Sequence, residues 1–331
     1  MDSKKIAVLG GGSWATALVK ILLDNKIDIR WWMRNEDSVN HIKSYHHNPR
    51  YLSSVELHIN STQVTSNLLD AVNECEIILL ATPSAFLKDV LEQIGHEALK
   101  GKTYISAVKG VIPGKNQIIG EFLNDDWGMS FDNFAVATGP THAEEIALEK
   151  LSYLTVASQN SALTKELTPY FSNRYVKVIP SDDIYGTEYA AVLKNIFAVA
   201  SGICHGLNYG DNFQAVLISN SIREMKSFVD SVHPIDRDIK ESAYLGDLLV
   251  TAYSQFSRNR TFGNMIGKGY SVKFAQMEMN MVAEGYYGAK TLHEVNKKYN
   301  VNLPICDAVY NILYNKKVPY LEMRKLAEVL N

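Results

Sequence analysis

A glycine-rich turn directly after a short apolar run is the feature that most constrains the fold of this chain. Residues 10–15 read Gly-Gly-Gly-Ser-Trp-Ala, follow the apolar run Ile6–Leu9 and open a stretch with helical apolar spacing. They match G-x-G-x-x-G/A with Ala15 at the third position. In such a turn Gly10 permits the tight bend, Gly12 lets backbone approach a pyrophosphate, and Ala15 allows close helix packing. This context favours a dinucleotide site over a plain glycine-rich turn.

The arrangement of apolar runs predicts two domains. The first half alternates short apolar runs with amphipathic stretches, as parallel βαβ units do. The predicted strands are Ile6–Leu9, Ile27–Met33, Ile77–Ala81, Thr103–Val108, Phe134–Thr138, Ser152–Ala157 and Tyr175–Ile179. From Tyr185 onward the spacing is helical with few breakers. We therefore predict an α/β chain: an NAD(P)-binding, Rossmann-like doubly wound sheet over residues 1–183, then an all-helical substrate and catalytic domain over 184–331.

Composition narrows the possible partners. The 331 residues carry 33 Lys and Arg against 36 Asp and Glu, which gives no basic field for nucleic acid. Cys75, Cys204 and Cys306 lie far apart and fit neither a disulfide framework nor a close-spaced metal site. No apolar run is long enough for a signal peptide or an integral membrane segment. We expect a cytoplasmic protein that binds a small molecule, no nucleic acid and no metal.

Arg34, at the end of the second predicted strand, bears on the choice of cofactor. NAD-selective domains usually place an acid there to bind the ribose 2′-hydroxyl. A guanidinium suits a 2′-phosphate instead, so we expect NAD or NADP to bind. The alternative leaves Arg34 on the surface and gives the ribose contact to Glu36 or Asp37.

Polar residues follow two further predicted strands, at the edge where open α/β sheets bind ligands. Lys109 follows the run that ends at Val108, and Gly139-Pro140-Thr141 follows Thr138. Both positions are candidates for contact with cofactor or substrate. Alternatively, Lys109 is a surface lysine, and Thr141 is a helix N-cap in a capping box with Glu144.

Lys194 stands among small and apolar residues in the long helical stretch that begins at Tyr185. Desolvation lowers the pKa of a lysine toward the range that is useful for proton transfer, so Lys194 is a candidate acid/base. The alternative is a lysine that extends from a buried helix to solvent.

Two later motifs combine polar groups. Asp247 begins a predicted helix and either takes part in the site or caps that helix. Ser257-Arg258-Asn259-Arg260 offers two guanidiniums, an amide and a hydroxyl, which suit a phosphate dianion. Basic tetrapeptides are also common on solvated surfaces.

In this order the segments resemble the NAD(P)-dependent glycerol-3-phosphate dehydrogenase family. The resemblance runs from Gly10 to about Pro304 and includes Gly-Leu-Asn-Tyr-Gly-Asp-Asn at 206–212 and Val-Ala-Glu-Gly at 282–285. It implies interconversion of sn-glycerol 3-phosphate and dihydroxyacetone phosphate by hydride transfer at C2. It also implies a homodimer that supplies glycerol 3-phosphate for phospholipid synthesis.

The resemblance implies roles for single residues. Lys194 is implied as the proton acceptor for the C2 hydroxyl. The implied substrate-site residues are Lys109, Gly139, Thr141, Lys194, Asp247, Ser257, Arg258 and Asn259. Besides Gly10 and Gly12 of the motif, the implied dinucleotide contacts are Ser13, Trp14, Arg34, Lys109, Ala143, Arg258, Val282 and Glu284.

The chain departs from the family pattern at two places. Ala15 stands where many members have glycine, a permitted substitution. Thr141 and His142 stand where members often have Ser and Phe; Thr141 keeps the hydroxyl, and His142 changes the packing near Ala143.

Two other functions compete with this prediction. A 6-phosphogluconate or hydroxyacyl-CoA dehydrogenase also joins a Rossmann domain to a helical one, but the Lys-Asn helix together with Ser-Arg-Asn argues against both. A dinucleotide-sensing protein without catalysis is the second alternative. The joint presence of Lys109, Lys194 and Asp247 argues against it.

Overall fold

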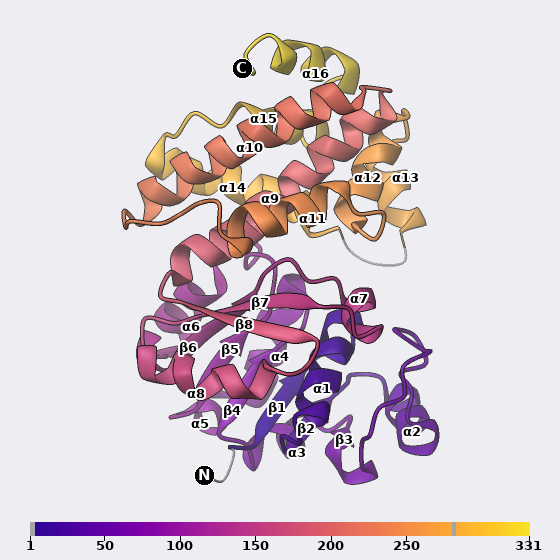
Figure 1. Cartoon of the computed structure of the whole chain (residues 1–331), viewed down its shortest axis with the longest axis vertical. Helices are drawn as coiled ribbons and strands as arrows, with labels where there is room; N and C mark the ends of the chain where they lie inside the picture. The colour runs from indigo at the N-terminus through magenta and orange to yellow at the C-terminus, as the bar shows by residue number, and fades with distance from the viewer. Residues whose placement is uncertain (1–3, 280–282) are drawn as a thin grey trace. The chain divides into compact units, whose positions relative to one another are not determined.

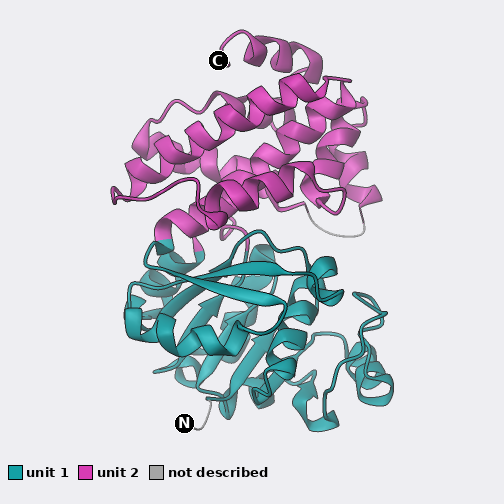
Figure 2. Ribbon diagram, viewed as in Figure 1, with its two compact units in different colours: residues 1–108, 119–184 teal, residues 109–118, 185–331 magenta. Residues whose placement is uncertain are grey.

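The chain divides into two compact units in the computed structural model, which describes residues 4–279 and 283–331. Unit 1 comprises residues 1–108 and 119–184, and unit 2 comprises residues 109–118 and 185–331 (Figure 2). We expected one boundary between residues 183 and 184. The structure adds the short segment 109–118 to the second unit, so the chain passes between the units three times.

Unit 1 is built on an eight-stranded sheet with the order β3-β2-β1-β4-β5-β6-β7-β8 (Figure 1). The strands are β1 (Ile6–Leu9), β2 (Ile29–Trp32), β3 (Val64–Thr65), β4 (Ile77–Leu80), β5 (Thr103–Ser106), β6 (Phe134–Thr138), β7 (Ser152–Ala157) and β8 (Val176–Ser181). Neighbouring strands are parallel except β6 and β7, which are antiparallel. The order from β3 to β6 is that of a doubly wound dinucleotide-binding sheet, which confirms the predicted fold class.

Helices cover both faces of this sheet. Those of unit 1 are α1 (Ser13–Asp24), α2 (Glu36–Tyr45), η1 (Ser61–Gln63), α3 (Leu68–Asn73), α4 (Ser84–Ile94), α5 (His96–Leu99), α6 (Ile119–Trp127), η2 (Phe131–Asn133), α7 (Ala143–Ala147) and α8 (Ser161–Phe171). Helices α1, α7 and α8 pack together and bury apolar side chains against one face. Helices α3, α4 and α5 contact one another. Right-handed crossover connections place them on the face opposite α1.

Unit 2 is helical, as predicted. Its elements are α9 (Ile184–Gly206), η3 (Ser242–Gly246), α10 (Asp211–Val232), α11 (Asp247–Tyr253), α12 (Arg258–Gly267), α13 (Val272–Glu278), α14 (Glu284–Tyr299), α15 (Pro304–Leu313) and α16 (Pro319–Ala327). Residues 186–204 of α9 are all buried, so this helix is the centre of the core of unit 2. A helix that is apolar nearly all round is buried on every side, which explains its sequence.

Glycines let α9 and α12 pack with their backbones in contact. A Cβ atom at Gly202 of α9 would lie 2.1 Å from the carbonyl oxygen of Arg260, and one at Gly263 of α12 would lie 2.1 Å from that of Val199. Neither position has room for a side chain. The spacing between α12 and the helix that carries Lys194 is therefore fixed by backbone contact.

Within residues 4–279 and 283–331, no helix combines the length and the apolarity that crossing a membrane requires.

Candidate active site

The three glycines at residues 10–12, called the glycine loop below, connect β1 to α1. Gly10 has a φ of +137°, and a Cβ atom there would lie 2.5 Å from the carbonyl oxygen of Ala81, so only glycine fits. Gly12 is the N-cap of α1 and makes no side-chain capping bond, and a Cβ atom there would meet no atom within 4 Å. The first turn of α1 contains no acidic residue. The loop thus leaves open space at an uncapped helix N-terminus, which fits a pyrophosphate.

Arg34 lies two residues beyond the end of β2 and is exposed. Its guanidinium lies over the ring of Phe86 in α4, 5.8 Å from the ring centroid. Phe86 was not predicted as a site residue, although its ring is an exposed flat surface of the kind on which bases stack. Glu36 and Asp37 occupy the first turn of α2, also exposed, so the alternative ribose contacts lie next to Arg34 in the chain.

The residues after β6 form a tight turn. Gly139 has a φ of +128°, a conformation that favours glycine, and the N–H and hydroxyl of Thr141 donate to its carbonyl oxygen at 2.8 and 3.2 Å. Helix α7 begins at Ala143 with His142 as its N-cap. The alternative of a capping box between Thr141 and Glu144 is therefore wrong, because the helix begins one residue later than that motif requires. Thr141 is buried and turned toward its own turn.

A buried ion pair lies in unit 2. Nζ of Lys194 in α9 is 2.5 Å from Oδ2 of Asp247, and the two residues are 3% and 1% exposed. Asp247 is the first residue of α11, directly after the π-helix η3, and Gly246 occupies the N-cap position. Asp247 is therefore not the helix cap. The hydroxyl of Thr251 donates to the backbone carbonyl of Asp247 at 2.7 Å. Short π-helical segments such as η3 often occur at functional sites.

Burial lowers the pKa of Lys194 to about 7. The carboxylate of Asp247 opposes this shift, and the positive charge of Lys109 adds to it. A lysine with a pKa near 7 exchanges protons readily at neutral pH. The alternative of an amine that extends into solvent is wrong for Lys194, because the side chain is buried.

Lys20 in unit 1 shows that burial alone does not produce this state. Burial lowers the pKa of Lys20 too, but its hydrogen bonds to Asp24 and Glu149, at 2.7 and 2.9 Å, leave that pKa raised. Two carboxylates keep Lys20 charged, whereas Lys194 has one carboxylate and a neighbouring cation.

Two asparagines connect four segments of unit 2. Nδ2 of Asn259 donates to Oδ1 of Asn195 at 2.9 Å, and Nδ2 of Asn195 donates to the carbonyl oxygen of Lys109 at 3.1 Å. Oδ1 of Asn259 accepts from the N–H of Gly285 at 2.9 Å. These bonds tie α12, α9, the segment 109–118 and the start of α14 together. The site prediction missed Asn195 and Thr251; a polar side chain beside Lys194 in an apolar helix was the available signal for Asn195.

The remaining predicted residues of unit 2 lie at helix starts. Ser257 is the N-cap of α12, with its hydroxyl accepting from the N–H of Arg260 at 3.3 Å. Arg258, the first residue of that helix, is exposed, and Glu284 is the first residue of α14. Val282 lies outside the described residues.

The predicted residues thus fall into sets within each unit. In unit 2, Lys194 is paired with Asp247, and Asn195, the residue after Lys194, connects Asn259 to the backbone of Lys109. In unit 1, Ser13 and Trp14 open α1 directly after the glycine loop, and Gly139, Thr141 and Ala143 follow β6.

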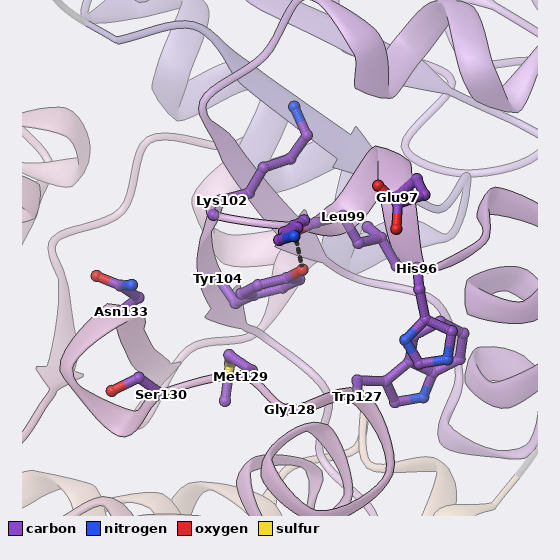
Figure 3. Close-up of a pocket in the computed structure, with 12 residues that line it drawn as sticks. His96, Glu97, Leu99, Lys102, Tyr104, Trp127, Gly128, Met129, Ser130 and Asn133 are labelled. Atoms are coloured by element: carbon purple, nitrogen blue, oxygen red, sulfur yellow. Dashed lines mark hydrogen bonds between the residues drawn. The ribbon is translucent and has the colours of Figure 1, made fainter.

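A pocket of about 440 Å³ opens elsewhere in unit 1, at the amino-terminal ends of β5 and β6 (Figure 3). The ring of His96 stacks on that of Trp127 at a centroid distance of 4.2 Å. The hydroxyl of Tyr104 donates to the carbonyl of Leu99 at 2.6 Å, and Lys102 donates to two backbone carbonyls. These polar groups are satisfied within the chain, and none of the predicted site residues that the structure describes lines the pocket, so we assign it no ligand.

The doubly wound sheet with its glycine loop, together with a buried lysine–aspartate pair in a helical unit, defines the class of dinucleotide-dependent oxidoreductases. The chain matches the NAD-dependent glycerol-3-phosphate dehydrogenase N-terminus over residues 5–164 and the C-terminus of the same family over residues 183–323. It is 35% identical over 323 residues to glycerol-3-phosphate dehydrogenase [NAD(P)+] of Staphylococcus carnosus, covering 97% of each chain. The chain belongs to the NAD-dependent glycerol-3-phosphate dehydrogenase family.

Solved structures agree with this assignment. The crystal structure of glycerol-3-phosphate dehydrogenase from Coxiella burnetii superposes with a TM-score of 0.92 at 28% identity, covering 99% of this chain and 100% of that one. The enzyme from Plasmodium falciparum gives a TM-score of 0.86 at 23% identity, covering 97% and 94%, a likeness of fold.

Proposed function

We propose that the protein catalyses the NAD- or NADP-dependent interconversion of sn-glycerol 3-phosphate and dihydroxyacetone phosphate. The observation that carries this proposal is the buried Lys194–Asp247 pair, with its lowered lysine pKa, in a chain of this family. Conversion between an alcohol and a ketone moves one hydride and one proton, and a lysine with a pKa near 7 suits the proton. A dinucleotide sensor without catalysis has no need of such a pair.

Lys194 moves the proton in this mechanism. In oxidation its neutral Nζ accepts the proton of the C2 hydroxyl, and in reduction its ammonium returns a proton to the developing alkoxide. Asp247 stabilises the ammonium and Lys109 opposes it, so both forms are available near pH 7. Thr251 holds the backbone of Asp247 at the start of α11.

Unit 1 binds the dinucleotide, which supplies the hydride acceptor or donor when bound. We assign the pyrophosphate to the glycine loop and the first turn of α1, because that helix N-terminus has no side-chain cap and open space beside it. We assign Arg34 to the adenosine end of the dinucleotide. The full proposed set of dinucleotide contacts is Gly10, Gly12, Ser13, Trp14, Arg34, Lys109, Ala143, Arg258, Val282 and Glu284.

Unit 2 supplies the main substrate contacts. We assign the substrate phosphate to Arg258, whose exposed guanidinium stands at the N-terminus of the ten-residue helix α12. Ser257 and Asn259 support this anchor, since one caps α12 and the other ties it to α9. The proposed substrate set is completed by Lys109, Gly139, Thr141, Lys194 and Asp247.

We further propose a homodimer in the cytoplasm that supplies glycerol 3-phosphate for phospholipid synthesis. This proposal is supported by the family alone. Light scattering on a size-exclusion column measures the mass of the assembly, and a monomeric mass would contradict the dimer.

The function is tested with dihydroxyacetone phosphate and either NADH or NADPH, and with two lysine variants. Lys194→Met should lower kcat by on the order of 10²-fold or more and leave NADH affinity unchanged, because only the acid/base is lost. Lys20→Met is the matched control, since it also removes a buried lysine paired with carboxylates. It should lower the Tm and preserve kcat. No turnover by the wild type with either dinucleotide, or near-normal kcat in Lys194→Met, would contradict the proposal.

The phosphate anchor is tested separately, by a cycle of wild type and Arg258→Ala with phosphorylated and unphosphorylated ketone at saturating NADH. Binding energy from a phosphate remote from C2 serves alignment as well as affinity, so the variant should raise KM and lower kcat for dihydroxyacetone phosphate. The variant should change KM and kcat little for dihydroxyacetone. If Arg258→Ala changes KM and kcat equally for both ketones, the phosphate would have to be assigned to Asn259, Arg260 or Lys109 instead.

A further inference from the structure

All three carbonyl groups of the glycine loop are held by side chains. Nε1 of Trp31 donates to the carbonyl oxygen of Gly10 at 2.6 Å, and Nδ2 of Asn48 donates to that of Gly11 at 3.2 Å. The hydroxyl of Thr16 donates to the carbonyl oxygen of Gly12 at 2.9 Å. These donors come from β2, from the segment after α2 and from α1. The conformation of the loop is thus set by contacts from three parts of unit 1.

Asn48 uses all of its amide hydrogen-bonding atoms within the chain. It is 0% exposed, and Nδ2 also donates to the hydroxyl of Thr16 at 2.8 Å, so both amide hydrogens are used. Oδ1 accepts from the N–H groups of Arg50 and Tyr51 at 3.0 and 3.3 Å. The two hydrogen bonds that Oδ1 accepts form a local turn, which fixes the segment that carries Asn48. A single side chain therefore connects that turn to both the loop and the first turn of α1.

Holding a carbonyl also fixes the next N–H. A trans peptide is planar, so the N–H of each unit points away from its carbonyl oxygen. With the carbonyl of Gly11 held by Asn48, the N–H of Gly12 points to the opposite side. The same argument applies to the N–H of Gly11, through Trp31, and to that of Ser13, through Thr16.

We propose that Asn48 is a positioning residue for dinucleotide binding, which orients the N–H of Gly12 toward the pyrophosphate before the ligand arrives. Preorganised donors bind more tightly because the ligand need not order them. The proposal rests on the assignment of the pyrophosphate to the glycine loop, as proposed above. It adds a residue that acts through the loop, since both amide hydrogens of Asn48 are used within the chain.

The experiment compares three variants by isothermal titration calorimetry with NADH and with ADP, which carries the same pyrophosphate. Asn48→Ala removes the proposed anchor. Asn25→Ala is the matched control, because Nδ2 of Asn25, at the other end of α1, donates to the carbonyls of Tyr170 and Ser172 at 2.8 and 3.0 Å. Asn48→Ser keeps a side-chain oxygen that can accept from the N–H groups of Arg50 and Tyr51 but removes the amide that donates to Gly11, so it decides the matter if Asn48→Ala does not fold.

We expect Asn48→Ala to raise the Kd for NADH and for ADP by on the order of 10-fold, because the part-buried carbonyl of Gly11 loses its donor and the loop loses its fixed orientation. At saturating NADH, kcat and the KM for dihydroxyacetone phosphate should stay within about twofold of wild type. Asn25→Ala should lower the Tm to a similar extent without changing either Kd, and Asn48→Ser should weaken the binding of both ligands as Asn48→Ala does. Unchanged Kd values in Asn48→Ala, or in Asn48→Ser where that variant decides, would overturn the proposal. So would an equal loss of affinity in Asn25→Ala.

A fourth variant separates this proposal from the one on which it rests. Gly12→Ala is compatible with the backbone at φ −78° and places its Cβ where the chain has no atom within 4 Å, so the fold should be retained. If Gly12→Ala weakens NADH and Asn48→Ala does not, only the role of Asn48 is overturned. If Gly12→Ala binds NADH normally, the glycine loop is not the pyrophosphate site and both proposals fail.

Discussion

Replacement of Asp247 by asparagine should lower the midpoint of the pH profile of kcat/KM in both directions of the reaction. Reduction of the ketone requires the ammonium form of Lys194, and oxidation of the alcohol requires the neutral amine. Because the pKa of Lys194 is lowered to about 7, kcat/KM for reduction should fall as the pH rises through about 7. Over the same interval kcat/KM for oxidation should rise.

The size of the shift follows from the geometry of the pair. Oδ2 of Asp247 lies 2.5 Å from Nζ of Lys194, and its charge favours the ammonium. An opposite charge at such a distance shifts a pKa by about 1–3 units, which corresponds to about 1.4–4 kcal/mol. Asparagine keeps the shape of the side chain and removes the charge. The midpoint should therefore move from about 7 to between about 4 and 6.

The assay measures initial rates in both directions between about pH 4 and pH 9 at saturating dinucleotide. The second ionisation of the substrate phosphate, near pH 6, is common to wild type and variant, so the comparison isolates Lys194. Asp24→Asn is the control, because Asp24 pairs with Lys20, and its profile should keep a midpoint of about 7. A midpoint in Asp247→Asn that stays at the wild-type value, or moves upward, would refute the assigned role of the pair.

Three further outcomes follow from other features. Arg34→Ala should weaken NADPH by about 1–3 kcal/mol and leave NADH nearly unchanged in calorimetric titrations, and equal losses would exclude a 2′-phosphate contact. Gly263→Ala should lower the Tm by several degrees, because its Cβ would lie 2.1 Å from the carbonyl oxygen of Val199. Gly210→Ala is the control and should leave the Tm unchanged, because its Cβ would meet no atom within 4 Å. Equal Tm values in the two variants would contradict the packing argument. Burial raises the pKa of Glu224 to about 8, so the folded chain holds a proton that the unfolded chain releases, and the wild type loses stability between about pH 4.5 and 8. The Tm advantage of wild type over Glu224→Gln should shrink across that interval, and a constant difference would be evidence against the shift.

Strands that coincide with an apolar run were predictable from the sequence. The bounds of β1, β6 and β7 are those predicted, because turn residues or polar residues flank each run. Strand β3 was missed, since two residues are too few to show a period of two. The antiparallel direction of β7 was also beyond prediction, because an apolar run has the same pattern in either direction.

The candidate site was predictable where a residue type and its local context carry the chemistry. Lys194 stands out because an amine in an apolar helix must be desolvated. Its partner Asp247 is 53 positions away, and the sequence left open whether that carboxylate caps a helix. Asn48 could not be found at all, because its function depends on a carbonyl 37 positions earlier in the chain.

The segment 109–118 limits how this chain can be divided. Val111 and Ile118 are buried in the core of unit 2, and the carbonyl of Lys109 accepts from Asn195. A fragment that starts at residue 185 therefore lacks two core side chains and leaves the amide of Asn195 without this acceptor. We expect such a fragment to be a poor independent folder, and a swap of helical units between relatives to succeed only when residues 109–118 are exchanged together with residues 185–331.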